Sequence, residues 1–520
     1  MRILQLHLWI VVILFAVSCV NGVTPGSEHA GEKPNIILIL VDDMGWSDLG
    51  CYGSEIDTPN LDVMAKQGIR FTQFYNTSKC FPSRACLLTG QYAQQIGMDR
   101  NAGVIQNAVT LGEVLQTAGY RTFASGKHHS TESLYERGFD HYYGLRDGAC
   151  NFWNPGVKRP GEPEPGRKDR IRAWCDDAET YQPYTPEDNN FYATDAFTDK
   201  PLQWLDEKEL DEQPFFLYLS YNAPHYPMHA WPEDIAKYKG KYDAGYDAIR
   251  KARYERMVKT GLINPAKSPL QEWSEGSWDS LSGEELAKEK LRMEIYAAML
   301  DRVDQNIGRI LTKLKQQGKL DNTLIMFASD NGGCAEGAGS KTKSTKIEDF
   351  GTVASYEAVG KNWATVQNTP LRYWKNYTHE GGIRTPFIMS WPGKIQEPGS
   401  FNREPGHFID IMSTLVELTG ATYPESFNEK PVKPMQGISL LSALENKPLV
   451  RTKPIFWQWK NGGGIRDGKM KAVFNGEKWE LHDMSLNTNE TNDLSQEIPE
   501  LLETYKTKWQ NWSNTVSEKD

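Results

Sequence analysis

Asn35-Ile36-Ile37-Leu38-Ile39-Leu40-Val41, followed directly by Asp42-Asp43, is the stretch that decides the fold. An apolar run of this length predicts a β-strand buried on both faces, as in the interior of a parallel sheet. Similar runs recur at residues 121–125, 215–220, 323–329 and 387–390, with helical patterns between them, the clearest over 292–317. This alternation predicts an α/β fold with a large, mainly parallel or mixed sheet flanked by helices.

The texture of the sequence changes after residue 450. Short apolar runs at 454–459, 471–474 and 479–482 are separated by glycine-rich turns, and a polar helical pattern covers 498–514. Such runs are typical of antiparallel strands. We therefore expect a catalytic domain over 33–450 and a small C-terminal α+β domain, built on an antiparallel sheet, over 451–520.

The composition is that of a soluble globular enzyme. The chain has 520 residues, of which 39% are hydrophobic and 24% charged, and its formal net charge of -10 argues against a nucleic-acid partner. Residues 8–17 form an apolar run behind Arg2 that is too short to span a bilayer. We expect a signal peptide over 1–22 and an exported protein, either periplasmic, secreted or on the cell surface. The alternative is a lipoprotein signal that ends before Cys19, in which case a lipid on Cys19 is the only link to a membrane.

The seven cysteines do not form the dense pattern of a disulfide framework. Cys150 and Cys175 flank a polar, proline-rich stretch and are the best candidates for one bridge. Residues 145–190 and 334–365 are long polar segments, which fit active-site walls and mobile insertions equally well. The basic residues of the first segment either form a wall for an anionic sugar chain or a solvated loop; they are Arg167, Lys168, Arg170 and Arg172.

Polar side chains follow four of the predicted strands at the point where each strand ends. They are Asp42 and Asp43, Lys127 with His128 and His129, His225, and Asp330 with Asn331. Open α/β sheets bind ligands at the carboxyl ends of their strands, so we expect these groups to converge on one site. The acids and the amide supply only hard oxygen ligands, which favour calcium, with magnesium second.

Cys80-Phe81-Pro82-Ser83-Arg84, continued by Ala85-Cys86-Leu87-Leu88-Thr89-Gly90, is the most specific motif of the chain. Pro82 suits the first turn of a helix, which places Cys80 at a helix N-terminus. Free amides and the helix dipole there attract an anion such as sulfate. Arg84 follows one turn later on the same face.

With these motifs the chain resembles the type I sulfatases of the alkaline-phosphatase superfamily, and among them the bacterial arylsulfatases. The resemblance extends from Lys33 to about Leu494. It also includes Lys375 ahead of His379-Glu380-Gly381-Gly382, and Trp479-Glu480-Leu481-His482-Asp483. It implies an alkaline-phosphatase-like fold and a Cys80 that a formylglycine-generating enzyme oxidises to an aldehyde.

The resemblance also implies the roles of the site residues. Asp42, Asp43, Asp330, Asn331 and the modified Cys80 match calcium ligands, and Arg84, Lys127, His129, His225 and Lys375 match catalytic and sulfate-binding positions. The family commonly has tryptophan where this chain has His128, and the spacing favours His129 as the acting histidine.

The implied reaction is hydrolysis of a sulfate ester, either an aryl sulfate or a sulfated carbohydrate, with release of inorganic sulfate. Asp330 activates a hydroxyl of the hydrated aldehyde, His225 protonates the leaving group, and His129 takes a proton from the second hydroxyl. One alternative is a phosphate or phosphonate ester hydrolase of the same superfamily. Another is a non-catalytic protein that binds sulfated glycans.

Overall fold

The structure is a computed structural model that describes residues 32–167, 171–337 and 346–517. The expected signal peptide with Cys19 lies outside these ranges, as do Lys168 and Arg170 of the basic loop. None of the helices in the described ranges is long and apolar enough to cross a membrane.

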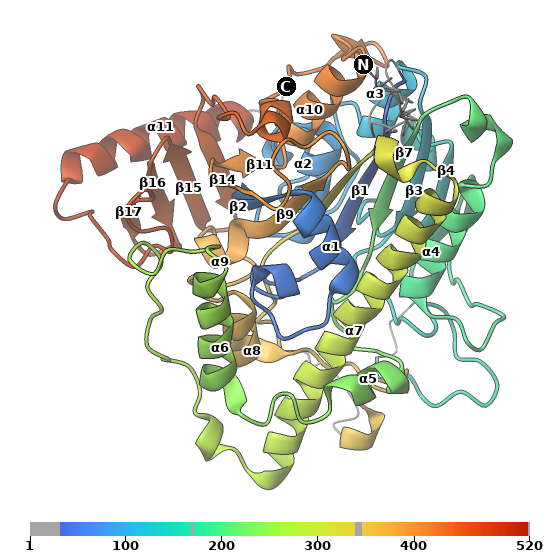
Figure 1. The fold of residues 1–520 in the computed structure, drawn as a ribbon, viewed down its shortest axis with the longest axis horizontal. Helices are drawn as coiled ribbons and strands as arrows, with labels where there is room; N and C mark the ends of the chain where they lie inside the picture. Colours follow the sequence, from blue (N-terminus) through green and yellow to red (C-terminus); the bar gives the residue numbers. More distant parts are fainter. Residues whose placement is uncertain (1–31, 168–170, 338–345, 518–520) are drawn as a thin grey trace, which may run out of the picture. The chain divides into compact units, whose positions relative to one another are not determined.

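An eleven-stranded mixed sheet forms the centre of the fold (Figure 1). Its strands are β1 (Asn35–Val41), β2 (Ile69–Tyr75), β3 (Arg121–Gly126), β4 (His141–Leu145), β5 (Trp174–Asp176), β6 (Glu179–Tyr181), β7 (Phe215–Ser220), β8 (Thr323–Ser329), β9 (Arg384–Ser390), β10 (Phe401–Asn402) and β11 (Gly406–His407). The order is β10-β2-β9-β8-β1-β7-β3-β4-β5-β6, with β11 also paired to β2.

The five neighbours β8, β1, β7, β3 and β4 are parallel, as the buried apolar runs predicted. Strand β9 begins at Arg384, earlier than expected, and runs antiparallel to both β8 and β2. The predicted large, mainly parallel or mixed sheet is therefore confirmed, with antiparallel strands toward its edges.

Helices cover both faces of the sheet. They are α1 (Pro59–Gln67), α2 (Cys80–Thr89), α3 (Leu111–Gln116), α4 (Ala193–Trp204), α5 (Pro232–Tyr238), α6 (Gly245–Lys259), α7 (Gly283–Gln316), α8 (Gly360–Gln367), α9 (Glu380–Ile383), α10 (Asp410–Thr419) and α11 (Pro499–Ser517). Side chains of β1 alternate between two cores: Ile37 and Ile39 face α1, α4 and α7, whereas Ile36 and Leu38 face α2, α3 and α10. Fully burying each such side chain contributes about 1.5–3 kcal/mol.

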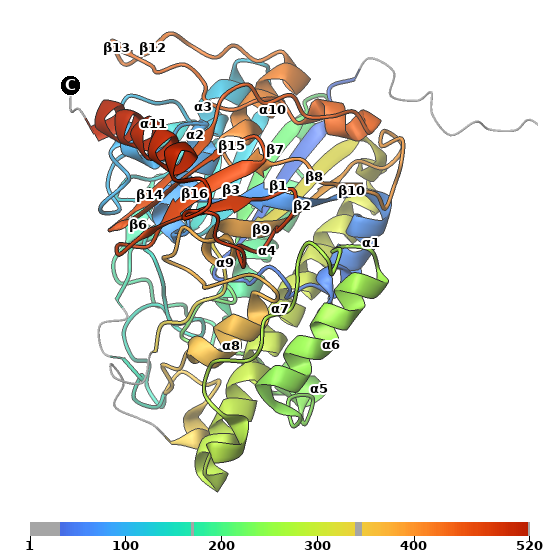
Figure 2. The ribbon, with the colours of Figure 1, turned by 90° about the vertical axis from the view of Figure 1, so that its left-hand side faces the viewer.

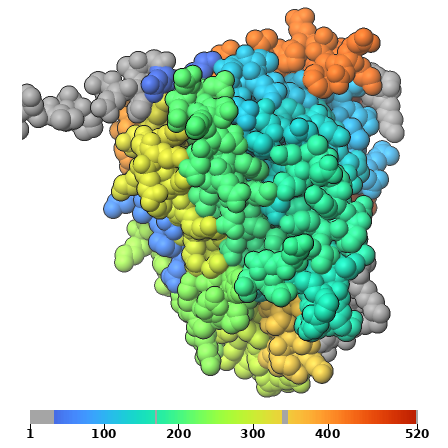
Figure 3. All heavy atoms as spheres, turned by 90° about the vertical axis from the view of Figure 1, so that its right-hand side faces the viewer, coloured from blue at the N-terminus to red at the C-terminus, as the bar shows by residue number. Residues whose placement is uncertain are grey.

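Helix α7 is longer than its apolar pattern indicated. It lies beside α4 and α5 (Figure 1) and begins at Gly283, where the hydroxyl of Ser282 accepts a hydrogen bond from the amide of Glu285. This cap satisfies an orphan donor and starts the helix ahead of the apolar stripe. The segment between β4 and α4 covers much of the face of the molecule that Figure 3 shows, where it is coloured teal to green.

The predicted bridge between Cys150 and Cys175 is wrong, because both thiols are free. Cys150 packs in the core that contains α7 and accepts a hydrogen bond from Asn222, whereas Cys175 packs in the core on the other face of the sheet. Two thiols separated by a sheet cannot approach to bonding distance.

The C-terminal region contains a separate antiparallel sheet of β14 (Ile455–Trp459), β15 (Gly462–Asp467), β16 (Met470–Phe474) and β17 (Trp479–Asp483), as predicted. Strand β15 was not predicted, since its glycines resemble a turn. Helix α11 packs on this sheet, whose strands lie beside β2 of the main sheet (Figure 2). Two further short strands, β12 (Ser426–Phe427) and β13 (Lys430–Pro431), pair with each other. The division into domains at residue 450 stays a prediction.

Candidate active site

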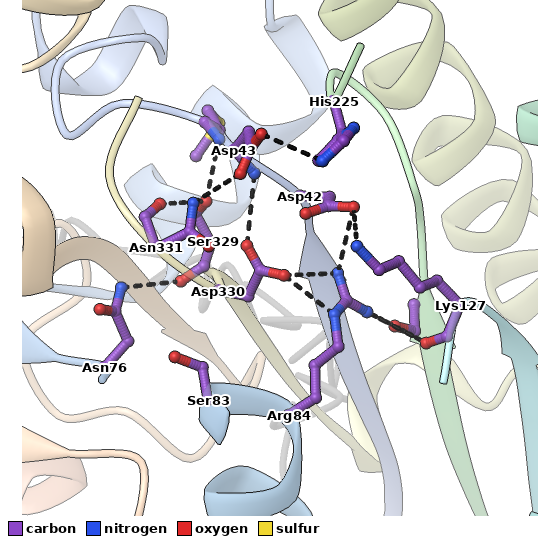
Figure 4. A network of polar contacts seen from close by, with 12 residues as sticks. Asp42, Asp43, Asn76, Ser83, Arg84, Lys127, His225, Ser329, Asp330 and Asn331 are labelled. Carbon is purple, nitrogen blue, oxygen red and sulfur yellow. Dashed lines mark hydrogen bonds and ion pairs between the residues drawn. The ribbon is translucent and has the colours of Figure 1, made fainter. Parts of the chain in front are cut away.

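The carboxyl ends of β1, β3, β7 and β8 bring together the polar groups that the sequence placed there (Figure 4). Asp42 and Asp43 follow β1, Lys127 follows β3, and Asp330 with Asn331 follows β8; all five are buried. His225 lies on the loop after β7 and is also buried. Parallel neighbours make this convergence inevitable, because their carboxyl ends share one edge.

Helix α2 contributes Cys80 and Arg84 to the same place. Cys80 is the first residue of the helix and only 2% exposed. The guanidinium of Arg84 donates from Nε to Asp330 Oδ2 over 2.9 Å and from a terminal nitrogen to the carbonyl of Lys127 over 3.0 Å. It also donates to the hydroxyl of Ser220 at the end of β7. These contacts hold Arg84 in one orientation.

Two lysines neutralise the aspartates that follow β1. Lys127 donates to Oδ2 of Asp42, and Lys375, from the loop before α9, donates to Oδ2 of Asp43 over 2.9 Å. The side-chain amide of Asn331 donates to Oδ1 of Asp43 over 2.7 Å. Arg84, Lys127 and Lys375 thus face three buried carboxylates, and the cluster is balanced in charge.

The histidines of the site differ in their surroundings. Nε2 of His225 lies 3.5 Å from Asp43 Oδ2, and its Nδ1 donates to the carbonyl of Tyr226 over 2.5 Å. The ring of His129 lies edge-to-face with Phe81, the neighbour of Cys80, with 5.5 Å between centroids. His128 packs near Tyr142 with both ring nitrogens unpartnered, as a packing residue does.

Burial and charge set the protonation of these groups. Burial raises the pKa of Asp330 to about 6, and the carboxylate of Asp42 adds to this against the opposing effect of Arg84. Burial also raises the pKa of Asp43, but Lys375 and His225 outweigh it and hold that pKa below its ordinary value. Burial lowers the pKa of His225 to about 3, and burial, with Lys127, lowers the pKa of His129, so both rings are neutral at pH 7.

The donor set fits a hard divalent cation. Oδ1 of Asp42 and Oδ1 of Asn331 are buried and have no hydrogen-bond partner. Ligand atoms of Asp42, Asp43 and His225 all lie within 4.8 Å of one another. A buried oxygen without a partner is costly, and a cation bound between these oxygens would satisfy both.

Sequence reasoning missed several residues at the mouth of the site. Glu336 accepts from Tyr226 over 2.5 Å and from Asn376 over 3.2 Å, and it lies 3.5 Å from Lys79. Trp459, at the end of β14, donates to Asn376 over 3.0 Å and lies edge-to-face with Phe81. No local pattern connects a C-terminal strand with this site. Ser220 could have been found, since it ends a predicted strand.

Comparisons with known proteins agree with this geometry. The sulfatase family profile matches residues 34–421. The chain is 34% identical to an uncharacterized sulfatase of Schizosaccharomyces pombe, over 91% of this chain and 92% of that one. It is 32% identical to an arylsulfatase of Klebsiella aerogenes, over 81% of this chain and 95% of that one.

Solved structures give the same result. The crystal structure of Ps i-CgsB superposes with a TM-score of 0.67 at 28% identity, covering 93% of each chain. A phosphonate monoester hydrolase of Agrobacterium radiobacter shares the fold at 19% identity and a TM-score of 0.60. Because the family profile and the curated relatives are sulfatases, the phosphate or phosphonate alternative is not favoured. The chain belongs to the sulfatase family and is a sulfuric ester hydrolase.

Proposed function

We propose that the protein removes sulfate from sulfated carbohydrates, with Cys80 oxidised to formylglycine and a calcium ion held by the aspartates around it. The observation that carries this is the buried, charge-balanced cluster at the N-terminus of α2, in which the acceptor oxygens Oδ1 of Asp42 and Oδ1 of Asn331 lack hydrogen-bond partners. An aryl sulfate is the simplest assay substrate for the same site.

Asp42, Asp43, Asp330 and Asn331 would hold the calcium, and the modified Cys80 would add an oxygen. Calcium supplies positive charge that stabilises the sulfuryl oxygens as the ester bond breaks. Three cations already balance three carboxylates here, so a bound divalent cation makes the site attractive to an anion. Magnesium fits less well, because it demands stricter octahedral geometry.

Oxidation of Cys80 supplies a hydrated aldehyde as the nucleophile, which a separate formylglycine-generating enzyme must produce. Arg84 and Lys127 are fixed beside Cys80 by Asp330 and Asp42, and together with Lys375 they orient the sulfate group. Their positions are set before substrate arrives, so little reorganisation is needed.

Three side chains move protons in this proposal. Asp330, whose pKa lies at about 6, accepts a proton from the nucleophile near neutral pH. His225 protonates the leaving oxygen from Nε2; the negative charge of a bound ester favours its charged form. His129 is neutral with a free Nδ1, as a group that accepts a proton from the second hydroxyl must be.

The mouth of the site favours a carbohydrate leaving group. The half-buried Tyr226 offers an aromatic ring, and Glu336 with Asn376 offers hydrogen-bonding groups beside it. The buried Trp459 holds Asn376 through a hydrogen bond. Sugars present both apolar C–H faces and hydroxyls, which such a surface can bind. Ps i-CgsB, a similar protein, has been crystallised with k-i-k-neocarrahexaose. Export through the leader at residues 1–22 would bring the enzyme to such polymers.

The test is the mass of the peptide that contains Cys80, from protein produced with and without a formylglycine-generating enzyme. We expect the aldehyde mass only with that enzyme, and aryl sulfate hydrolysis in proportion to it. A phosphate ester of the same phenol should react far more slowly. An unmodified thiol in fully active protein would contradict the nucleophile, and a faster phosphate ester would contradict the substrate class.

A further inference from the structure

A cavity of about 470 Å³ lies where the C-terminal sheet meets the edge of the main sheet. Thr72 and Gln73 of β2 line one side, and Ile455 of β14 and Arg466 of β15 line the other. Tyr75, the last residue of β2, packs with Ile455 and Trp457 of β14 at this edge. The catalytic cluster, as we call the buried charged groups of the candidate active site, contributes no residue to this cavity. Its members are Asp42, Asp43, Cys80, Arg84, Lys127, His225, Asp330, Asn331 and Lys375.

An irregularity in β2 creates the space. The register of β2 against β9 shifts between Phe71 and Phe74. On its other side, β2 pairs first with β10 and then with β11, and the residues between those strands, 403–405, line the cavity instead of pairing. A bulge at a sheet edge bends the strand and interrupts its ladder, which leaves room for side chains to surround a hollow.

The cavity is strongly basic in a chain whose formal net charge is -10. Its cations are Lys267, Arg384, Arg403, Arg451, Arg466 and Lys469, and its one carboxylate is that of Glu404. Arg384 and Arg466 are buried at the floor, whereas Lys267, Arg403 and Lys469 are exposed at the rim. This concentration of positive charge attracts an anion.

Half of these cations have no carboxylate partner. Within the described residues no carboxylate lies within ion-pair distance of Lys267, Arg403 or Arg466. The guanidinium of Arg403 is instead held by the carbonyls of Gly261 and Leu262, over 2.7 and 3.2 Å. Arg466 donates to Gln73 over 2.8 Å. Neutral acceptors fix the direction of these cations and leave their charge uncompensated.

The floor of the cavity also holds donors without acceptors. Nε of Arg384 and Nε of Arg451 are buried and lack a hydrogen-bond partner. Arg384 is 3% exposed, so water satisfies it poorly. Burial, with a smaller contribution from the neighbouring cation Arg384, lowers the pKa of Arg403. An oxyanion would satisfy the free donors and the excess charge together.

We propose that this cavity binds a sulfated oligosaccharide, as a second site that holds the polymer while another part of it is cleaved. Water occupies about 30 Å³ per molecule in the liquid, so a cavity of about 470 Å³ is much larger than one sulfate ion requires. Leu262, Ile455 and Met484 add apolar surface for the C–H faces of sugar rings. The inference rests on the proposed function, because only a sulfated polymer would engage both sites.

Binding is measured by calorimetry on the full-length Cys80→Ala protein, which cannot turn over its substrate. The probes are a sulfated carrageenan-type hexasaccharide, its desulfated form, and sodium sulfate compared with sodium chloride at equal ionic strength. We expect the sulfated hexasaccharide to bind a site that Lys267→Gln together with Arg403→Gln weakens about tenfold. Binding there should also weaken as salt is added.

Lys469→Gln is a second rim variant that leaves Arg403 and its carbonyl contacts in place, and it should weaken the same site. Lys315→Gln, at the exposed end of α7, is the matched control and should change nothing. Unchanged affinity in both rim variants overturns the proposal. So does tighter binding of free sulfate than of the hexasaccharide, which would assign the cavity to a free oxyanion.

The outcomes separate this inference from the proposed function. In otherwise wild-type enzyme, Lys267→Gln with Arg403→Gln should leave aryl sulfate turnover unchanged and raise the KM for a sulfated polymer. If this double variant turns over the polymer with an unchanged KM, the proposed binding site in the cavity is overturned and the proposed function is not. A protein that hydrolyses aryl sulfates but no sulfated polymer contradicts the carbohydrate substrate, whatever the cavity binds.

Discussion

The catalytic cluster and the basic cavity leave opposite kinds of polar atoms unsatisfied. In the cluster every cation has a carboxylate, including Nη2 of Arg84, which makes no hydrogen bond but pairs with Asp330. The oxygens without a partner there are Oδ1 of Asp42 and Oδ1 of Asn331. In the cavity the unpartnered atoms are the donors Nε of Arg384 and Nε of Arg451. A buried acceptor without a partner favours binding of a cation, and a buried donor without a partner favours binding of an anion. Buried polar atoms that lack hydrogen-bond partners therefore indicate the charge of the ligand.

Burial also divides the two regions. Asp42, Lys127 and Asp330 have no exposed surface, whereas Lys267 and Arg403 stand in solvent. Buried charges interact strongly and are little screened, while exposed ones weaken with salt. The cluster suits chemistry at one fixed position, and the cavity suits reversible capture of a flexible polymer.

The largest expected effect separates hydrolysis at the catalytic cluster from oligosaccharide binding in the cavity. Cys80→Ala should reduce aryl sulfate hydrolysis by on the order of 10⁴-fold or more, because no other group can replace the nucleophile. Hexasaccharide binding in the cavity should stay as in the parent. Cys51→Ser, at a half-buried cysteine outside the site, is the control and should retain activity. Steady-state rates measure hydrolysis, and calorimetry measures hexasaccharide binding. If Cys80→Ala abolished both, the two regions would not act separately.

Lys471 tests how much a buried lysine paired with carboxylates contributes to the free energy of unfolding. Lys471 is buried and bound to Glu380 over 2.7 Å and Glu490 over 2.6 Å. Lys471→Met leaves the buried carboxylate of Glu490 unpaired and Glu380 with Arg384 alone, and it should lower the free energy of unfolding by about 3–5 kcal/mol. Lys506→Met, which breaks a surface pair with Glu503, should cost no more than about 1 kcal/mol. Urea denaturation measures both; equal losses would contradict the role of burial.

Calcium should act on the cluster and leave the cavity unaffected. Calcium should raise the melting temperature of the wild-type protein, since a ligand that binds only the folded state stabilises it. Asn331→Ala removes one ligand and should weaken calcium binding about 10- to 100-fold. Hexasaccharide binding in the cavity should be the same with calcium and with a chelator. An equal melting temperature with calcium and with a chelator would refute the metal site.

The smallest effect is a pH dependence of stability. Burial lowers the pKa of His407 to about 3, with Arg451 adding to it, so the native ring is neutral. The unfolded chain binds that proton at its ordinary pKa of about 6.5, so stability is lost as pH falls from about 6.5 toward 3. The slope is at most about 1.4 kcal/mol per pH unit for one group.

His407→Gln should therefore flatten the decline in unfolding free energy between pH 7 and pH 5, measured in urea. His141→Gln, at a half-buried histidine beside Asp177, is the control. Equal slopes in the wild type and His407→Gln would show that His407 is protonated in the native state.

Much of the catalytic cluster could be located from sequence, because strand ends are easy to find. Asp42 and Asp330 each follow a long apolar run, Lys127 follows a shorter predicted strand, and parallel strands bring their carboxyl ends together. Ser220 was within reach of the same argument. Trp459 was not, since its strand belongs to a separate sheet more than three hundred residues from Cys80. The predicted bridge failed because sequence spacing does not tell which face of a sheet a cysteine occupies.

The sequence by itself determined the α/β architecture, the edge of the sheet where the polar cluster lies, the family and the nucleophile candidate, because apolar runs and compact motifs are local signals. Only the tertiary structure decided which oxygens remain unpartnered, which histidine is a packing residue, and that Trp459 reaches Asn376 and Phe81 beside the site. It alone revealed the basic cavity, whose cations come from segments scattered between Lys267 and Lys469. Pairing and burial arise from contacts between distant segments, and no local pattern encodes them.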